Sequence, residues 1–372
     1  MIPYEFEVKE IVKSKGVRVE PYCIVASNSN TALEECLSEI SPPYVVKAQV
    51  RGWGRAKAGL VKFAEDREEA RRGVAELFAR TFGGAPIRYV MVSKRLGILR
   101  ELYLSVMVNY APPYILLLAS RSGGVEVEEQ ASRDGVLRIK IDPFEGVRDY
   151  MVRYISKFLD VPLDPLRGIL EGLYSAIWDY NLHLLELNPL AVTENGIIAL
   201  DAKAIVDDDA LEQNPRLGEI RSRYESELTD EEALARKMGF SVVLLNGDTA
   251  VIGNGAGLTM ATLDALVSLG GSPGLFLDLG GGASAERVKA AMSLVLGKLS
   301  IKRVLVNILG GITRCDEVAK GVVEALKESG RRDMKIVFRL SGFREEEGRR
   351  ILEDYGIRAF KSFEDAVREV VR

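Results

Sequence analysis

The sequence predicts two domains, an α+β domain followed by an α/β domain with a parallel sheet. The 372 residues are too many for one compact core. The first half mixes strands and helices irregularly, and turn signals such as TENG at 193–196 indicate antiparallel strands. The second half repeats one unit of strand, glycine-rich turn and helix four times, which is typical of a parallel sheet with right-handed crossovers.

Hydrophobic periodicity predicts the elements of the first half. Helices are expected at 3–15, 30–40, 66–80, 145–159 and 165–180, and strands at 44–50, 59–64, 86–93, 99–109, 114–120, 183–188 and 197–205. The charged stretch at 221–237 has no clear apolar stripe and is interpreted as a connector. We therefore expect one domain over 1–238 and a second over 239–372.

The four repeats of the second half place glycines at the carboxyl ends of their strands. The third copy, NILGGITRCDEVAKGVVEAL at 307–326, runs from a strand through two glycines into a helix. Glycine lets backbone N–H groups approach an anion, and a helix N-terminus favours negative charge. The chain has one histidine, His183, interpreted as a core residue, and Cys315 has no base near it in the sequence, so we interpret it as structural.

Composition excludes several classes of function. The formal charge of −4 argues against a nucleic-acid or anionic-membrane partner, and the longest apolar run, at 114–119, is too short to span a bilayer. The first residues are charged and amphipathic, unlike a signal peptide. The three cysteines are odd in number and lack metal-ligand spacing, which predicts a reducing, cytoplasmic setting.

The stretch YVVKAQVRGWGRAKAG at 44–59 carries charge of a kind that suits phosphate. Lys47 lies in an apolar strand, where a lysine needs an anion to pair with. The following loop has three glycines and three cations, which suits a flap that closes on phosphates. The spacing differs from the P-loop pattern, and a basic hairpin in solvent is the alternative interpretation.

The stretch HLLELNPLAVTENGIIALDAKAIV at 183–206 predicts a hairpin with a polar face. Glu186 and Asn188 share a face of the first strand, as Asp201 and Lys203 do on the second. A turn centred within TENG places Asn188 opposite Asp201. An amide oxygen and a carboxylate together suit Mg²⁺, which takes its remaining ligands from phosphate and water. The alternative is a hairpin with a solvated polar face.

Seven motifs in order resemble the β subunit of succinate–CoA ligase over essentially the whole chain. They are VVKAQV…GRAKAG, KRLGILRELYLS, SGGVEVEE, ELNPLAV, GNGAGLTMATLD, FLDLGGGASAERV and VNILGGITRCDEVAKGV. The resemblance implies an ATP-grasp domain followed by a flavodoxin-like CoA-ligase domain. It implies the tricarboxylic acid cycle reaction ATP + succinate + CoA = ADP + phosphate + succinyl-CoA. It also implies an α subunit that carries CoA and a phosphorylated histidine, at which the helix after GGITRC points.

The resemblance carries roles to matching positions. Glu186 matches an acidic residue beside the phosphohistidine. Ala56 and Ser93, both assigned to the nucleotide site, stand where the family usually has Gly and Glu. The Ala56 departure implies a stiffer loop, and the Ser93 departure leaves both ATP and GTP as candidates. Leu96 lies in the same hinge loop as Ser93 and is assigned to the nucleotide site with it. The matching residues are the nucleotide-binding Lys47, Gly54, Arg55 and Glu101, the Mg²⁺ ligands Asn188 and Asp201, and Asn254, Gly311, Ile312 and Thr313 for carboxylate and phosphate.

Two other functions fit parts of the sequence. Malate–CoA ligase, or another ADP-forming acyl-CoA ligase, shares this organisation, and the motifs do not separate it from the succinate enzyme. A non-catalytic nucleotide-binding regulatory subunit would fit the Ser93 departure, but the Asn188 and Asp201 pair argues for catalysis. The resemblance is compatible with both αβ and α₂β₂ assembly.

Overall fold

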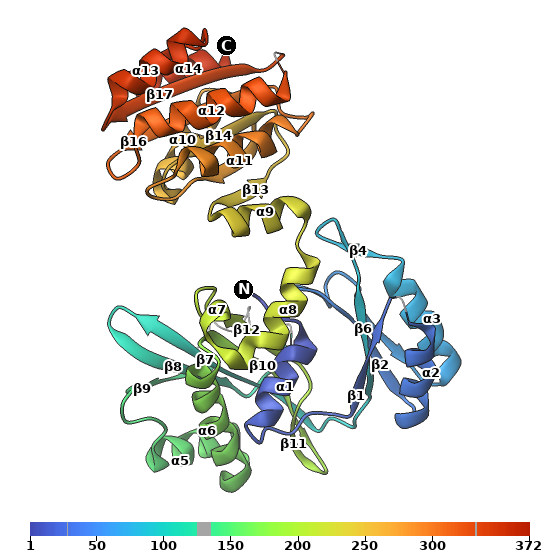
Figure 1. Ribbon diagram of the computed structural model, residues 1–372. Helices are drawn as coiled ribbons and strands as arrows, with labels where there is room; N and C mark the ends of the chain where they lie inside the picture. Colours follow the sequence, from blue (N-terminus) through green and yellow to red (C-terminus); the bar gives the residue numbers. More distant parts are fainter. Residues whose placement is uncertain (28, 125–134, 332) are drawn as a thin grey trace. The chain divides into compact units, whose positions relative to one another are not determined.

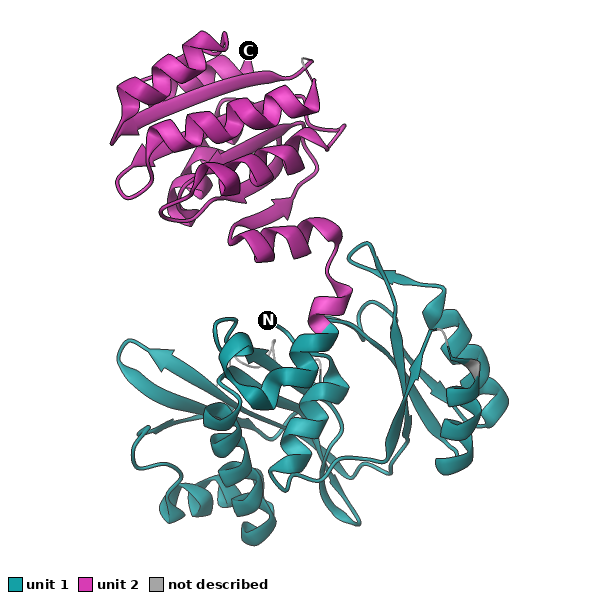
Figure 2. Ribbon diagram, in the orientation of Figure 1, with its two compact units in different colours: residues 1–223 teal, residues 224–372 magenta. Residues whose placement is uncertain are grey.

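The chain divides into two compact units, Met1–Arg223 and Tyr224–Arg372 (Figure 2). A computed structural model describes residues 1–27, 29–124, 135–331 and 333–372. Residues 125–129 of the motif SGGVEVEE lie outside that described part. Helix α9 (Asp230–Met238) precedes the boundary expected after residue 238, yet its Ala235 packs into the core of the second unit.

The first unit contains two main antiparallel sheets (Figure 1) and a separate two-stranded sheet of β4 and β5. The smaller sheet has the strand order β1-β6-β2-β3, and helices α2 and α3 share its core. Helix α3 starts at the N-cap Asp66, whose carboxylate accepts a hydrogen bond from the backbone N–H of Glu69. The bounds are β1 (Tyr22–Ala26), α2 (Asn30–Glu39), β2 (Tyr44–Gln49), β3 (Val61–Ala64), α3 (Arg67–Phe78), β4 (Thr81–Phe82), β5 (Ala85–Pro86) and β6 (Tyr89–Lys94).

The larger sheet has the order β11-β10-β7-β8-β9, with β12 also paired to β10. Helices α1, α5 and α6 contribute apolar side chains to its core. The bounds are α1 (Glu5–Ser14), β7 (Arg100–Tyr110), β8 (Pro113–Ser120), β9 (Val136–Ile141), α5 (Asp149–Leu159), α6 (Leu163–Asp179), β10 (Leu182–Thr193), β11 (Gly196–Ala199), β12 (Ala202–Val206) and α7 (Ala210–Gln213).

The second unit is a doubly wound sheet with the order β13-β15-β14-β16-β17-β18. All of its strand pairs are parallel except β13 with β15, which confirms the parallel sheet predicted from the repeats. Helices α11 and α12 share a core on one face, and α10 and α14 share a core on the other (Figure 1). The bounds are β13 (Ser241–Leu244), β14 (Thr249–Gly253), α10 (Ala256–Ser268), β15 (Pro273–Asp278), α11 (Ala285–Leu296), β16 (Arg303–Gly310), α12 (Cys315–Ser329), β17 (Lys335–Gly342), α13 (Glu345–Asp354), β18 (Ala359–Phe360) and α14 (Phe363–Val371).

The order from β15 to β18 is that of flavodoxin-like folds. Strand β14 lies between β15 and β16 in the sheet. The chain passes from β14 to β15 on one side and then crosses to β16 on the other, so the crossovers change direction between β14 and β16. Ligands of such sheets bind outside the carboxyl ends of the strands at this point. Asn254 follows β14 and the Gly311–Thr313 turn follows β16, so both lie at that edge.

The connector is helical, which differs from the sequence interpretation of 221–237. It is formed by the end of α8 (Gly218–Glu227) and by α9. Thr229 and Glu232 form a capping box at the start of α9, and Gly239, with φ of 72°, ends it in the left-handed conformation. Local capping therefore supports a helix where the apolar stripe is weak.

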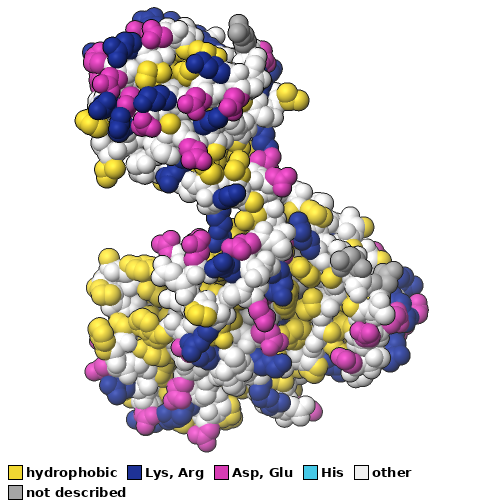
Figure 3. Space-filling model, in the orientation of Figure 1, with side chains coloured by type: hydrophobic (Ala, Val, Ile, Leu, Met, Phe, Trp, Pro, Cys, Tyr) yellow, Lys and Arg dark blue, Asp and Glu magenta, His cyan; other side chains and the backbone are white. Residues whose placement is uncertain are grey.

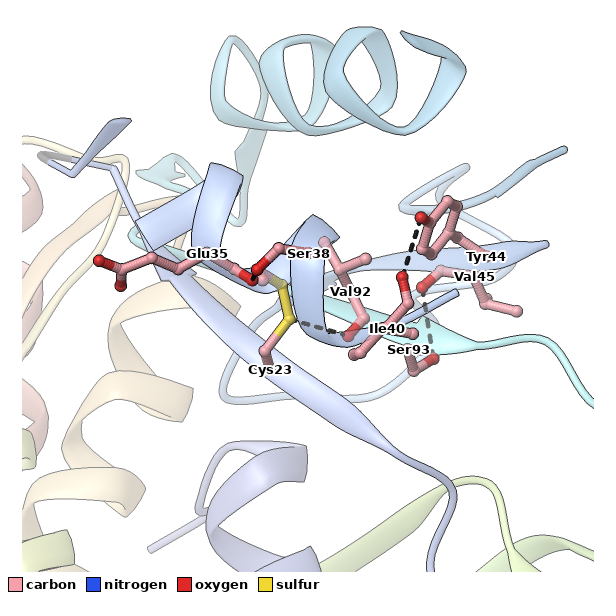
Figure 4. The surroundings of a disulfide bond; sticks show 9 residues. Cys23, Glu35, Ser38, Ile40, Tyr44, Val45, Val92 and Ser93 are labelled. Carbon is pink, nitrogen blue, oxygen red and sulfur yellow. Dashed lines mark hydrogen bonds between the residues drawn. A yellow bond between two sulfur atoms is a disulfide. The ribbon is translucent and has the colours of Figure 1, made fainter. Parts of the chain in front are cut away.

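Cys23 and Cys36 form a disulfide between β1 and α2 (Figure 4), with Cα atoms 5.7 Å apart. This pairing was not anticipated from the sequence. The odd cysteine count was a poor guide, because the sequence does not show that Cys36 on α2 packs over the strand that carries Cys23. Cys315 is buried and not disulfide-bonded in the described chain.

The described surface carries charge of both signs. On the face shown in Figure 3, Lys and Arg side chains are interspersed with Asp and Glu over the second unit. Within the described ranges, no helix is both long and apolar enough to cross a membrane.

Candidate functional site

A cavity of about 710 Å³ lies between the two sheets of the first unit. Val45 and Val61 contribute apolar surface from the smaller sheet, and Pro189 and Leu200 from the larger. Such an apolar slot with a few polar groups suits a planar base. Its described lining residues are Glu20, Pro43, Val45, Lys47, Val61, Phe63, Ser93, Lys94, Arg95, Leu96, Gly97, Ile98, Glu101, Pro189, Leu200 and Asp201.

The segment from Ser93 to Ile98 forms the hinge at the back of this cavity. It is held in place by backbone hydrogen bonds from Lys94 to Pro21 and from Arg95 to Pro43, both 2.9 Å. The Ser93 hydroxyl donates to the Val45 carbonyl oxygen at 3.3 Å, as Figure 4 shows. Ser93 is thus tied to strand β2 and presents no carboxylate to a ligand.

Lys47 projects from β2 into the cavity and is almost fully buried. Its Nζ donates to Glu5 Oε1 at 2.9 Å and to the Leu200 carbonyl oxygen at 2.7 Å. Burial by itself lowers the pKa of Lys47, but the carboxylates of Glu5, Asp201 and Glu20 outweigh it and raise that pKa. The side chain therefore stays a cation, ready to hold an anion.

The glycine-rich loop places one buried cation, Arg55, against Asp201, which lines the cavity. Gly54, Arg55 and Ala56 are not among the described residues that line the cavity. Gly54 and Ala56 are exposed, and Gly54 has φ of 85°, which a side chain would disfavour. Arg55 is buried, and its Nη2 donates to both carboxylate oxygens of Asp201 at 2.9 Å, while its Nη1 lies 2.6 Å from Glu5 Oε2.

The hairpin at 182–206 has the register that the sequence predicted. Thr193 pairs with Gly196 and Glu186 with Lys203. The backbone N–H of Asn188 donates to the Asp201 carbonyl oxygen at 3.1 Å, so the two residues are direct neighbours. The Asn188 side chain exchanges hydrogen bonds with the backbone of Gly124, at 2.6 Å to its N–H and 3.3 Å to its carbonyl oxygen.

Asn188 and Asp201 offer the types of oxygen that a magnesium ion takes, although in this structure these oxygens accept hydrogen bonds from Gly124 and Arg55. One carboxylate, one amide oxygen and an adjacent cavity for phosphates form a donor set of the kind that Mg²⁺ prefers. The described residues contain no group of three or more His, Cys, Asp or Glu that could hold a metal by themselves. Any ion here would therefore take further ligands from phosphate or water.

Glu186 lies on β10 two residues from Asn188 and outside the lining of the cavity. The Tyr103 hydroxyl donates to its Oε2 at 3.3 Å. Burial raises the pKa of Glu186, and Lys203, Asn188 and Tyr103 oppose that shift without cancelling it. Glu101, on β7, lines the cavity and is exposed.

In the second unit, Asn254 joins the ends of β14 and β16. Its side chain accepts from the Leu309 N–H and donates to the Leu309 carbonyl oxygen, both at 2.9 Å. Thr313 is buried, and its hydroxyl oxygen accepts from the Gly282 N–H at 3.1 Å. Gly311 is exposed and Ile312 is 88% exposed, so the turn is open within its own unit.

Two further residues with reactive side chains, Cys315 and His183, were interpreted from the sequence as structural. Cys315 begins α12, but burial raises the pKa of its thiol, which supports the structural interpretation. His183 is half-exposed and bonded to the Tyr110 hydroxyl, so the expected core position is wrong.

Comparison with known proteins finds a family match in each of the two units. Residues 3–192 match the ATP-grasp domain family and residues 252–372 match the CoA-ligase family. The solved structure of ATP citrate lyase from Methanothrix soehngenii, in complex with citrate and coenzyme A, superimposes with a TM-score of 0.79 over 100% of this chain and 99% of that one. Its sequence identity of 21% supports a likeness of fold. The chain is thus a two-domain protein of the ATP-grasp and CoA-ligase class.

Curated relatives narrow the class to one family. The succinate–CoA ligase [ADP-forming] subunit β of Desulfurococcus amylolyticus is 43% identical over 376 residues, covering 99% of this chain and 98% of the relative. The subunits of the same name from Pyrobaculum calidifontis and Methanocaldococcus jannaschii are 41% and 37% identical, each covering 99% of this chain and 98% of the relative. The chain belongs to the family of ADP-forming succinate–CoA ligase β subunits. It is therefore a ligase subunit, and membership of a β-subunit family implies an α-subunit partner.

Sequence reasoning missed two acidic residues, Glu20 in the lining of the cavity and Glu5 behind two of the site's cations. Glu20 lines it, and Glu5 contacts both Lys47 and Arg55. The signal that could have found Glu5 is its i,i+4 spacing to Lys9 in a segment whose other face is apolar.

Proposed function

We propose that this chain binds Mg-ATP and succinate as the β subunit of a succinate–CoA ligase and passes the phosphoryl group to and from a histidine of an α subunit. The reaction is ATP + succinate + CoA = ADP + phosphate + succinyl-CoA. The observation that carries the proposal is the cavity of the first unit, where Lys47 and Asp201 share a wall beside an apolar slot. The relatives named for this reaction support it over 99% of the chain.

The residues of the first unit supply charge and position. Lys47 holds phosphate oxygens, and Arg55 adds a second cation once its guanidinium turns from Asp201 to the nucleotide. Asn188 and Asp201 would hold Mg²⁺, which neutralises charge on the phosphates when it is bound. Ser93, Leu96 and the hinge backbone would hold the base, and the loop of Gly54 and Ala56 would cover the phosphates.

The residues of the second unit would receive the phosphoryl group and the carboxylate. Asn254 and the open Gly311–Thr313 turn lie at the edge where ligands of such sheets bind. The start of α12 offers helix-dipole stabilisation to a phosphorylated imidazole of the partner chain. We place the reaction in the cytoplasm, because both ATP and CoA are intracellular substrates.

Transfer to the partner chain tests this function. The purified chain is mixed with its α partner, Mg²⁺ and γ-labelled ATP, and we expect label on a histidine of the α chain that succinate and CoA then discharge. Rates with succinate, malate and acetate should be highest for succinate. Absence of label on the α chain would contradict the phosphoryl transfer, and a faster rate with malate would contradict the choice of acid.

Glu186 should impose an acid limb on the pH profile. Its carboxylate orients the imidazole by accepting an N–H, so the ionised form is the active one. Because burial raises its pKa above the ordinary value of 4.5, activity should fall as the pH drops through a midpoint above 4.5. In Glu186→Gln the rate should drop about 10²-fold and the acid limb should disappear.

The matched control is Glu194→Gln, which changes an exposed glutamate in the turn of the same hairpin. It should leave both the rate and the acid limb unchanged. Phosphorylation of the α chain measured from pH 4.5 to 8 checks this prediction, and an acid limb that persists in Glu186→Gln would show that another group titrates.

A further inference from the structure

A cluster of buried charges adjoins the nucleotide cavity, and two of its members lie on helix α1, which no motif singled out. Glu5 and Lys9 are one turn apart on α1, and Glu20 follows in the next segment. The side chain of Lys9 is 0% exposed, and its Nζ lies 3.1 Å from Glu5 Oε1 and 2.5 Å from Glu20 Oε1. A lysine is rarely buried so completely unless it is paired. We therefore look for the function of Lys9 in the two carboxylates that it contacts, those of Glu5 and Glu20.

Glu5 connects this cluster to the phosphate-binding cations. Its Oε1 accepts from Lys47 Nζ at 2.9 Å, and its Oε2 forms an ion pair with Arg55 Nη1 at 2.6 Å. One carboxylate therefore contacts three cations, Lys9, Lys47 and Arg55. Burial would raise the pKa of Glu5, but Arg55, Lys47 and Lys9 together lower it well below its ordinary value. Glu5 therefore remains a carboxylate.

The hydrogen bonds of the Lys47 ammonium group show how Glu5 orients it. An ammonium group has three N–H donors. Two of them are used by Glu5 Oε1 and by the Leu200 carbonyl oxygen. Lys47 lines the cavity, and no described residue uses its third donor, which can therefore serve a ligand there.

The cluster is also balanced in charge. Lys9, Lys47 and Arg55 face the carboxylates of Glu5, Glu20 and Asp201. Buried charges are tolerated when they are paired in this way, whereas removing one partner leaves an uncompensated charge. Lys47 is thus held in place before a nucleotide arrives, and the Glu5 ion pair keeps Arg55 close by, so less ordering remains to be done on binding.

We propose that Glu5 is a positioning residue that orients Lys47 and Arg55 for the nucleotide. Lys9, which pairs with both Glu5 and Glu20, holds Glu5 in place. The inference rests on the proposed function, because the ligand of Lys47 and Arg55 is taken to be the triphosphate. Glu5 touches the two cations and not the cavity itself, so it acts through them.

The test compares Glu5→Ala with Glu7→Ala, a matched control on the same helix. The Glu7 side chain is also 1% exposed and also paired with two cations, Arg51 at 3.2 Å and Arg223 at 2.6 Å. In the part of the chain that the structure describes, Glu7 contacts neither Lys47 nor Arg55. Both substitutions should therefore lower the melting temperature, and a purely structural role would make their effects on nucleotide binding alike.

The readouts are calorimetric titration of the full chain with Mg-ATP, and the KM values of the assembled enzyme. Glu5→Ala should weaken ATP binding about 10-fold or more, because hydrogen bonds to charged groups contribute at this level. The KM values for succinate and CoA should change less than about twofold, and Glu7→Ala should bind ATP like the wild type. Glu5→Gln keeps the volume and one acceptor oxygen, so it should fold and give an intermediate ATP affinity.

Three outcomes would overturn the inference. Equal ATP affinities of the Glu5 and Glu7 variants would make the role structural. Tighter ATP binding by Glu5→Gln would mean that Glu5 competes with phosphate. A wild-type chain that binds no Mg-ATP would refute the proposed function as well, which distinguishes that failure from the other two.

Discussion

Replacing Asp201 with Asn is expected to lower the rate of phosphoryl transfer to the α chain about 10³-fold, the size of effect seen when a charge-stabilising group is removed. The substitution removes the carboxylate that would hold Mg²⁺ beside Asn188. It also removes the partner that receives two hydrogen bonds from Arg55. Labelling of the α-chain histidine in the first seconds after mixing with γ-labelled ATP measures the change.

Asp207→Asn serves as the control for this prediction. Asp207 directly follows β12, the strand that begins next to Asp201, and its side chain is exposed and outside the lining of the cavity. It should retain the wild-type rate. A rate for Asp201→Asn within about tenfold of the wild type, with an unchanged melting temperature, would show that Asp201 is not part of the transfer machinery.

Reduction of the Cys23–Cys36 disulfide should lower the free energy of unfolding of the first unit by about 3 kcal/mol. The two cysteines are 13 residues apart, and a crosslink that closes a loop of this length restricts the unfolded chain by about that amount. Chemical unfolding with and without dithiothreitol, followed by the fluorescence of Trp53 and Trp178 in the first unit, measures the difference.

Two cysteine variants separate the disulfide from other effects of the reductant. Cys36→Ser should unfold like the reduced wild type and should not respond to dithiothreitol. Cys315→Ser, in the second unit, should keep the response of the first unit. Coincident unfolding curves for oxidised and reduced wild type would refute the stabilising role.

The fold of the second unit could be predicted because local patterns specify it. Each of its four expected strands is followed by glycine and a helix, and the parallel crossover then fixes the layers. In the first unit, β1 and β9 were not expected. Strand β1 is five residues long and only one of them is buried, so its hydrophobic signal is weak.

The candidate site was predictable where a turn fixes the geometry. The TENG turn set the register that brings Asn188 beside Asp201. The contact between Arg55 and Asp201 was not predictable, because the two residues are 146 positions apart in the sequence and meet only where the two sheets lie next to each other in the fold. The role of Glu5 was hidden for the same reason, since it depends on a loop and a hairpin that are remote in sequence.

The pairing of Arg55 with Asp201 has a consequence for selectivity. A divalent cation that arrives without a nucleotide must displace a guanidinium that already neutralises the carboxylate. A metal–nucleotide complex brings a replacement anion for that guanidinium and thereby frees the carboxylate. If Asp201 holds the metal as proposed, we expect the protein to bind a metal–nucleotide complex more readily than a bare ion.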